Sequence, residues 1–387
     1  GGENTLYGGT GNDTIYTAYT ATSKKAIGQR GDVVYGGRGT DTLVGSFNED
    51  FLIGGEEENN ADVETDWIDY SNLVLGANTY GISVNLEQTT NFTDTGDRDY
   101  LDGNYSQVIR LDSNGNEIVS QFDYISQIEN ITGSSGDDTF TGNTSQNSIL
   151  AGAGDDIIYY TRGLDYYDGG NHTTSSGQGS GTPSVGGGDW ISLAKETTTT
   201  VNFDLYNSSV GANITNSSAT VTNIENIIGY NGVQATTGWG TDSNNTFVMY
   251  AGNDSIIGRQ GDDVYDLGDG SDTAFTSYGN DTIIGGAGID RLDYTNLYSS
   301  ANQANIIILT SQDLNGDGDI DDTNEKVTTS SIKVQGLATL TDGTYYNFFE
   351  IRDGGTGFFD YLYQESNGTA DIEIFYLTNI TAQADIF

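Results

Sequence analysis

The stretch Gly36–Val44 reads Gly-Gly-Arg-Gly-Thr-Asp-Thr-Leu-Val, and Gly8–Tyr16 reads Gly-Gly-Thr-Gly-Asn-Asp-Thr-Ile-Tyr. In both nine-residue stretches glycines precede an aspartate, and a large apolar residue follows the aspartate by two positions. Glycine permits the left-handed backbone of tight turns, and a single apolar residue suits the inward position of a very short strand. Each unit therefore predicts a turn followed by a short strand.

This unit recurs in register along the chain. Asp or Asn returns every nine residues in three runs, namely Asn4, Asp13, Asp32, Asp41 and Asp50, then Asp138, Asn147, Asp156 and Asp165, then Asn245, Asp254, Asp263, Asp272, Asp281 and Asp290, with one insertion between Asp13 and Asp32. Asp189 opens the segment that leaves the second run. A fixed step over many copies is typical of repeat folds in which each unit stacks on its neighbours.

An apolar residue stands two positions after most of these polar residues. Examples are Leu6, Ile15, Val34, Leu43, Leu52, Phe140, Ile149, Ile158, Phe247, Ile256, Tyr265 and Ile283. We expect these side chains to point into the interior of the stack.

The units resemble RTX nonapeptide repeats, whose pattern is Gly-Gly-x-Gly-x-Asp-x-U-x with U a large apolar residue. The resemblance is to the secreted surface-layer or adhesin type, and it implies an all-β parallel β-roll. It also implies several Ca²⁺ ions, each lying between turns two repeats apart and held by Asp side chains and turn carbonyls. Such sharing is necessary because Ca²⁺ takes six to eight oxygen ligands, more than one unit supplies.

On this resemblance the metal ligands are the polar residues of the three runs together with Asp189 and the glycines that shape the turns. These glycines are Gly9, Gly11, Gly37, Gly39, Gly152, Gly154, Gly286 and Gly288. Asn4, Asn147 and Asn245 offer an uncharged oxygen, so we expect weaker sites there, at the ends of or interruptions in the runs.

A separate calcium candidate lies in the last quarter of the chain. Asp313, Asn315 and Asp317 have the spacing of the first half of an EF-hand loop, and Gly318 fits the glycine at position six. The twelfth position is Asn324 where a glutamate is expected, so a solvated acidic hairpin turn is the alternative.

The repeat runs alternate with other strand-like segments, and this alternation predicts that the chain divides into six segments. They are a β-roll at 1–66, a β insertion at 67–132, a second roll at 133–190, a second insertion at 191–240, a third roll at 241–294, and a β capping and secretion-signal region at 295–387. Because Gly1 and Gly2 look like the middle of a repeat, we expect the chain to be the C-terminal part of a longer or processed polypeptide.

Composition narrows the function. A formal charge of −43 disfavours nucleic acid and anionic membranes as partners, and the absence of cysteine removes disulfide, zinc-thiolate and thiol chemistry. No apolar run is long enough to span a bilayer. His172 is the only histidine, in a polar loop, and the sequence lacks hydrolase, zinc-protease and nucleotide-binding motifs, so we expect no enzyme.

Two functions fit these observations. The first is a structural protein of the bacterial cell surface, such as a surface layer, filament or adhesin, which self-associates and has cell-surface polysaccharide as a candidate partner. The second is the calcium-dependent secretion and folding module of an exported enzyme, such as a protease, lipase or alginate epimerase. The acidic and apolar end Ala384–Phe387 resembles a type I secretion signal, so we expect an extracellular location in either case.

Overall fold

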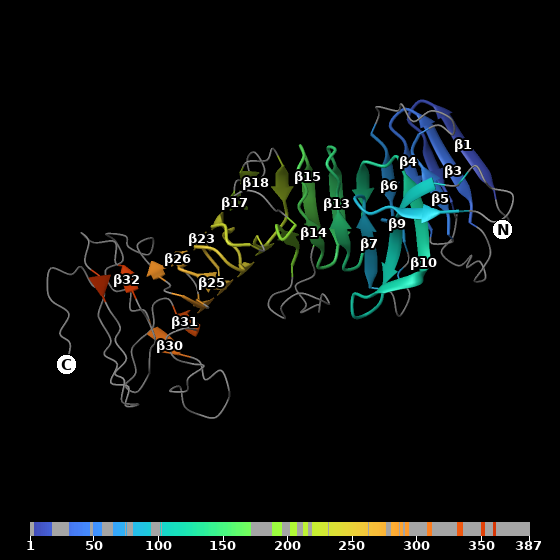
Figure 1. Cartoon of the computed structure of the whole chain (residues 1–387). Coiled ribbons are helices and arrows are strands. Elements are labelled where there is room, and N and C mark those ends of the chain that lie inside the picture. The colour runs from blue at the N-terminus through green and yellow to red at the C-terminus, as the bar shows by residue number, and fades with distance from the viewer. Residues whose placement is uncertain are drawn as a thin grey trace. The chain divides into compact units, whose positions relative to one another are not determined.

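A computed structural model describes residues 4–17, 31–46, 49–55, 65–73, 75, 80–93, 101, 103–171, 188–195, 202–206, 212–215, 219–230, 232–261, 263–275, 280–285, 287–288, 291–293, 308–311, 331–335, 350–352 and 359–360. In these residues the regular elements are strands, and no α-helix is present (Figure 1). Most neighbouring strands run parallel, which confirms the expected all-β parallel β-roll.

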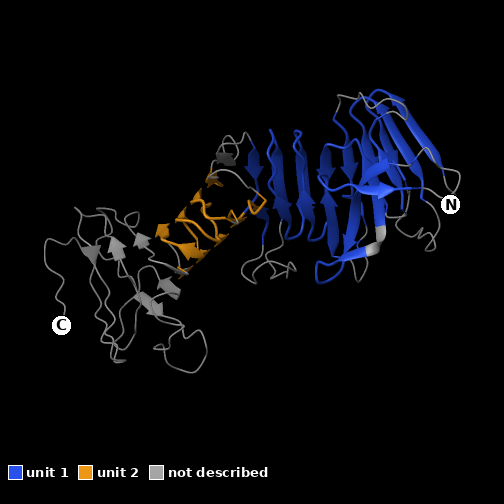
Figure 2. Cartoon of the chain, viewed as in Figure 1, with its two compact units in different colours: residues 1–191, 217–224 blue, residues 192–216, 225–387 orange. Residues whose placement is uncertain are grey.

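The chain forms two compact units (Figure 2). Unit 1 comprises residues 1–191 and 217–224, and unit 2 comprises 192–216 and 225–387. The six sequence stretches set out above remain predictions.

Unit 1 contains two sheets built from alternating strands of the chain. The first sheet has the order β1 (Thr5–Thr10), β3 (Val33–Arg38), β5 (Phe51–Ile53), β10 (Glu117–Ser126), β9 (Gly103–Leu111), β7 (Gly81–Asn85), β12 (Thr139–Thr141), β14 (Ile157–Tyr159) and β16 (Trp190–Ser192), with β8 (Thr90–Phe92) paired to β9. The second has the order β2 (Thr14–Tyr16), β4 (Thr42–Val44), β6 (Trp67–Asp69), β11 (Asn130–Thr132), β13 (Ser148–Ala153), β15 (Tyr166–Asn171) and β19 (Thr220–Thr222).

Unit 2 repeats this arrangement. Its first sheet is β20 (Asn226–Ile228), β22 (Thr246–Val248), β24 (Val264–Asp266), β27 (Asn280–Ile284), β31 (Ser331–Gln335) and β30 (Ile308–Ser311). Its second sheet is β18 (Ala212–Thr215), β17 (Asn202–Asp204), β21 (Thr237–Trp239), β23 (Ser255–Ile257), β26 (Thr273–Phe275), β29 (Arg291–Asp293), β32 (Glu350–Arg352) and β33 (Phe359–Asp360). A two-stranded sheet joins β25 (Asp269–Gly270) and β28 (Ala287–Gly288).

Two nine-residue units make one coil of the roll. Phe140 pairs with Ile158, and Phe247 pairs with Tyr265, each 18 residues further along the chain. The chain thus passes through one strand of each sheet before it returns beside its starting strand. Every apolar position predicted to point inward is buried wherever its side chain is described, except Leu6 and Ile15 on the terminal strands β1 and β2, which are half-buried.

The first insertion is woven into the sheet of the roll. Strand β10 pairs in parallel with β5, so that Ile125 lies beside Leu52 as a further coil would. Strand β9 then runs antiparallel to both β10 and β7, and β7 pairs in parallel with β12. In unit 2, β17 and β18 likewise form an antiparallel pair, and β17 continues in parallel to β21.

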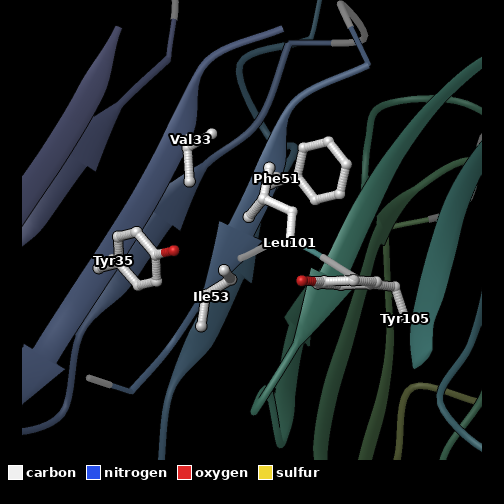
Figure 3. Packing of buried hydrophobic residues seen from close by; sticks show 6 residues of the cluster. All are labelled: Val33, Tyr35, Phe51, Ile53, Leu101 and Tyr105. Atoms are coloured by element: carbon white, nitrogen blue, oxygen red, sulfur yellow. The ribbon is translucent and has the colours of Figure 1, made fainter. Parts of the chain in front are cut away.

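An aromatic cluster lies on the opposite face of the first sheet from the coil interior. Phe51 and Ile53 alternate along β5 with the inward Leu52, and they pack with Leu101 and Tyr105 from the first insertion (Figure 3). The Phe51 ring stacks on Tyr124 with 4.6 Å between ring centroids. The insertion therefore covers a sheet face that the repeat pattern alone would leave to solvent.

Candidate metal centres in the glycine turns

The full glycine turns require a backbone that other residues rarely adopt. Gly37 and Gly39 have φ angles of 111° and 130°, and Gly9, Gly11, Gly152 and Gly154 share the positive φ. A Cβ atom on Gly37 would collide with the carbonyl oxygen of Gly9 in the neighbouring coil. The turns of successive coils therefore stack closely, which brings their carbonyl oxygens near one another.

In most repeat aspartates one carboxylate oxygen accepts a hydrogen bond from the backbone of the preceding coil. The backbone N–H of Asp13 donates to Oδ1 of Asp41 at 2.8 Å, and that of Asp138 donates to Oδ1 of Asp156 at 2.7 Å. The N–H of Asp156 in turn donates to Oδ1 of Asp189 at 2.8 Å. Repetition of this bond from coil to coil holds the carboxylates in files along the roll.

The second carboxylate oxygen, Oδ2, points back into its own turn. A Cβ placed on Gly36 would meet Oδ2 of Asp41, and one on Gly169 would meet Oδ2 of Asp189. Oδ2 of Asp156 and Oδ2 of Asp13 are both buried and accept no hydrogen bond. A buried anionic oxygen without a donor is strongly unfavourable unless a cation or a proton compensates it.

The pKa values of several repeat aspartates also show that burial disfavours their charged form. Burial raises the pKa of Asp138 to about 8, although hydrogen bonds oppose the shift. Burial, together with the carboxylates of Asp138 and Asp189, holds the pKa of Asp156 well above its ordinary value. Burial also raises the pKa of Asp254 in unit 2 to about 6. Without a metal Asp138 would carry a proton near neutral pH.

Calcium fits this chemistry. The turns offer oxygen atoms only, from carboxylates and stacked carbonyls, and Ca²⁺ prefers such ligands. No group of three or more His, Cys, Asp or Glu side chains gathers in metal-binding geometry within the described ranges. Turn carbonyls must therefore supply most of each coordination shell, and two coils must share each ion.

The predicted ligands lie along two edges of the roll. We call the turns that lead from the first sheet to the second the first edge, and those that lead back the second edge. In unit 1 the first edge carries Asp13, Asp41, Asn147 and Asp165, and the second edge carries Asn4, Asp32, Asp50, Asp138, Asp156 and Asp189. In unit 2 the first edge carries Asp254 and Asp272, and the second edge carries Asn245 and Asp263.

Three acidic residues extend these files without belonging to the nine-residue register. The N–H of Asp41 donates to Oδ1 of Asp66 at 2.7 Å, and the N–H of Asp66 donates to Oε2 of Glu129 at 2.8 Å. On the other edge the N–H of Asp50 donates to Oδ1 of Asp123 at 3.0 Å. The sequence pattern missed them because insertions separate them from their neighbours in the file.

Some predicted ligands cannot be placed. The side chain of Asp281 is not described, although its backbone lies in β27, and Gly288 is described only as part of β28. Gly286, Asp290, Asp313, Asn315 and Asp317 lie outside the described residues, as does His172.

Comparison with known families agrees with this geometry. The RTX calcium-binding nonapeptide repeat matches residues 1–18, 28–59, 132–167, 239–274 and 275–293. No curated protein matches the chain. The matched segments contain most of the glycine turns and aspartate files described above, and repeats of this kind bind calcium in secreted proteins. The chain therefore contains RTX calcium-binding nonapeptide repeats and folds as a parallel β-roll.

Proposed function

We propose that the chain is a non-catalytic structural protein of the bacterial cell surface, in a surface layer, an extracellular filament or an adhesin, that folds and assembles with calcium. The carrying observation is the continuity of the coil stack in unit 1. The insertion strand β10 pairs with β5 in register, and the carboxylate file passes from Asp50 to Asp123 without a break. A stack that absorbs its insertions in this way suits a mechanical scaffold.

The charge of the chain supports calcium-dependent self-association. With a net charge of −43, copies of the chain repel one another in the absence of bound cations. Calcium removes part of this charge, and calcium between copies would link them. Copies of the same chain are therefore the proposed main partner, with cell-surface polysaccharide as a further candidate. The proposed export route is type I secretion.

The proposal assigns no chemical reaction to the chain. Its buried carboxylates are already committed to the files of the roll, and it has a single histidine and no cysteine. No helix long and apolar enough to cross a membrane occurs in the described part of the chain.

Electron microscopy of the secreted protein tests this function. We expect ordered sheets or filaments in millimolar calcium and their dissolution by a chelator, with recovery when calcium is restored. Soluble single particles in both conditions, or a catalytic domain preceding Gly1 in the native polypeptide, would favour the secretion and folding module of an exported enzyme instead.

A further inference from the structure

In unit 1 the turns with positive-φ glycines lie on the first edge in the first run and on the second edge in the second run. In the first run the positive-φ glycines Gly9, Gly11, Gly37 and Gly39 lie on the first edge, before Asp13 and Asp41. In the second run Gly152, Gly154, Gly170 and Gly188 lie on the second edge, before Asp156 and Asp189. The turns 142–147 and 160–165, which lie opposite on the first edge, contain no residue with positive φ.

Asp165 on this opposite edge has one hydrogen bond that Asp156 lacks, the bond to Oδ2. Its Oδ2 accepts a hydrogen bond from the Tyr167 hydroxyl at 2.8 Å, and its Oδ1 accepts one from the backbone N–H of Asn147 at 2.8 Å. Oδ2 of Asp156 accepts none. The two aspartates occupy the same position of the repeat, so the difference arises from the surrounding side chains.

On the same edge the side-chain amide of Asn147 forms hydrogen bonds with backbone groups of the turns. Its Nδ2 donates to the backbone carbonyl of Glu129 at 2.8 Å, and its Oδ1 accepts from the backbone N–H of Asn143 at 2.8 Å. Since a carbonyl can only accept and an N–H can only donate, these two contacts fix the orientation of the amide. The amide nitrogen therefore occupies the position beside the Glu129 carbonyl at which a cation could bind that oxygen.

On the second edge, opposite the glycine turns of the first run, protein donors also bind the carboxylate oxygens. Oδ2 of Asp50 accepts a hydrogen bond from the Ser46 hydroxyl at 2.9 Å. Oδ2 of Asp123 accepts one from the fully buried Tyr70 hydroxyl at 2.6 Å. The Arg110 guanidinium, which is partly buried, interacts electrostatically with Asp123 and Tyr70 and supplies positive charge from the protein itself.

We propose that unit 1 binds calcium along only one edge at a time, on the first edge up to Asp66 and on the second edge from Asp156, while hydrogen-bond donors of the protein close the opposite edge without metal. This inference rests on the proposed calcium-dependent function. It replaces the expectation that Asn4, Asp32, Asp50, Asn147 and Asp165 are calcium ligands. The first insertion is the point at which the metal file changes edge.

A matched pair of variants of the full chain tests the proposal. Bound calcium per chain is measured by equilibrium dialysis for the unmodified protein, Asp156→Asn and Asp165→Asn. We expect Asp156→Asn to lose at least one ion and Asp165→Asn to lose none. Loss from Asp165→Asn, or loss from neither variant of a protein that binds calcium, overturns the inference alone. An unmodified protein without bound calcium would instead overturn the calcium function itself.

Asn147→Asp gives an independent test by the direction of its effect. The new carboxylate would face the Glu129 carbonyl, so we expect folding to need more calcium than in the unmodified protein. If Asn147 were a calcium ligand, the added charge would strengthen the site and folding would need less calcium. Asn143→Asp is the control, because its side-chain oxygen still accepts from the Ser145 N–H, and we expect no shift.

Anomalous scattering from crystals of the unmodified chain gives the same answer without a variant. We expect calcium peaks beside the turn 151–156 and none beside the turn 160–165. A peak at the second turn would contradict the proposal.

Discussion

Asp156 and Asp165 illustrate how neighbouring atoms decide the role of one residue type. Both follow the same repeat spacing, and both give one carboxylate oxygen to a backbone N–H of the preceding coil. The Tyr167 hydroxyl donates a hydrogen bond to the second carboxylate oxygen of Asp165, whereas the corresponding oxygen of Asp156 is buried without a donor. Calcium affinity in the roll therefore depends on which second oxygen is left to a cation.

Gly37 provides a residue-scale prediction about the turns. Gly37→Ala would force an alanine to φ near 111° and push its Cβ onto the Gly9 carbonyl. We expect a loss of about 2 kcal/mol or more, measured by urea unfolding in saturating calcium. The control is Gly103→Ala, because a Cβ there would meet nothing closer than 3.5 Å. Equal stability of the two variants would contradict the stacked-turn geometry.

Asp138 provides a prediction about pH. Burial raises its pKa from 3.8 to about 8 in the metal-free fold, so its protonated form stabilises that fold fully below pH 3.8, and this stabilisation is lost as the pH rises to about 8. In a chelator we therefore expect more folded protein at about pH 5.5 than at about pH 8.5.

Saturating calcium should reverse this pH dependence, because calcium binds the deprotonated carboxylates and competes with protons. Near-ultraviolet circular dichroism of the tyrosines follows both titrations. The same pH slope with and without calcium would show that these carboxyl groups do not bind the metal.

At the scale of elements, the short strands are stable because each is one step of a stack. A three-residue strand such as β12 forms few hydrogen bonds by itself, but it pairs on both sides, with β7 and with β14. The first insertion adds a second layer of packing, because its aromatic residues cover the outer face of β3 and β5. This layer needs no metal.

Phe51 tests that layer. Phe51→Ala removes a ring that is 3% exposed and packs against the rings of Phe92, Tyr105 and Tyr124, so we expect a loss of about 3–5 kcal/mol in urea unfolding. Bound calcium per chain should stay the same. Tyr16→Ala, which removes a ring that is 56% exposed, should change stability by less than about 0.5 kcal/mol. Loss of calcium in Phe51→Ala would contradict the separation of the two layers.

The sequence predicted those elements whose signal is local. The nine-residue step placed the strands, the inward apolar residues and the aspartate files, because a stacked coil repeats its contacts at a fixed spacing. Asp123 could not be found this way, since it lies 73 residues after the partner whose N–H it accepts. The outer aromatic cluster was missed because it joins repeat strands to an insertion with no period. The closure of one edge depends on side-chain donors such as Tyr167, which the repeat pattern treats only as an inward apolar residue.

At the scale of the whole molecule, calcium must offset a net charge of −43. An ion at tenfold excess over its dissociation constant stabilises the folded state by about 1.4 kcal/mol, so several ions together approach the full stability of a typical domain, about 5–15 kcal/mol. Export from a cytosol poor in calcium into a medium rich in it would then couple folding to secretion.

The most direct measurement of this account is a calcium titration of the chelated full chain, followed by far-ultraviolet circular dichroism. We expect little β structure in the chelator and a cooperative gain of it as calcium is added. Magnesium should not replace calcium, since it holds its water ligands and demands a stricter octahedral geometry. A chain that keeps its complete β signal after exhaustive chelation would contradict the claim that calcium between stacked turns assembles the roll.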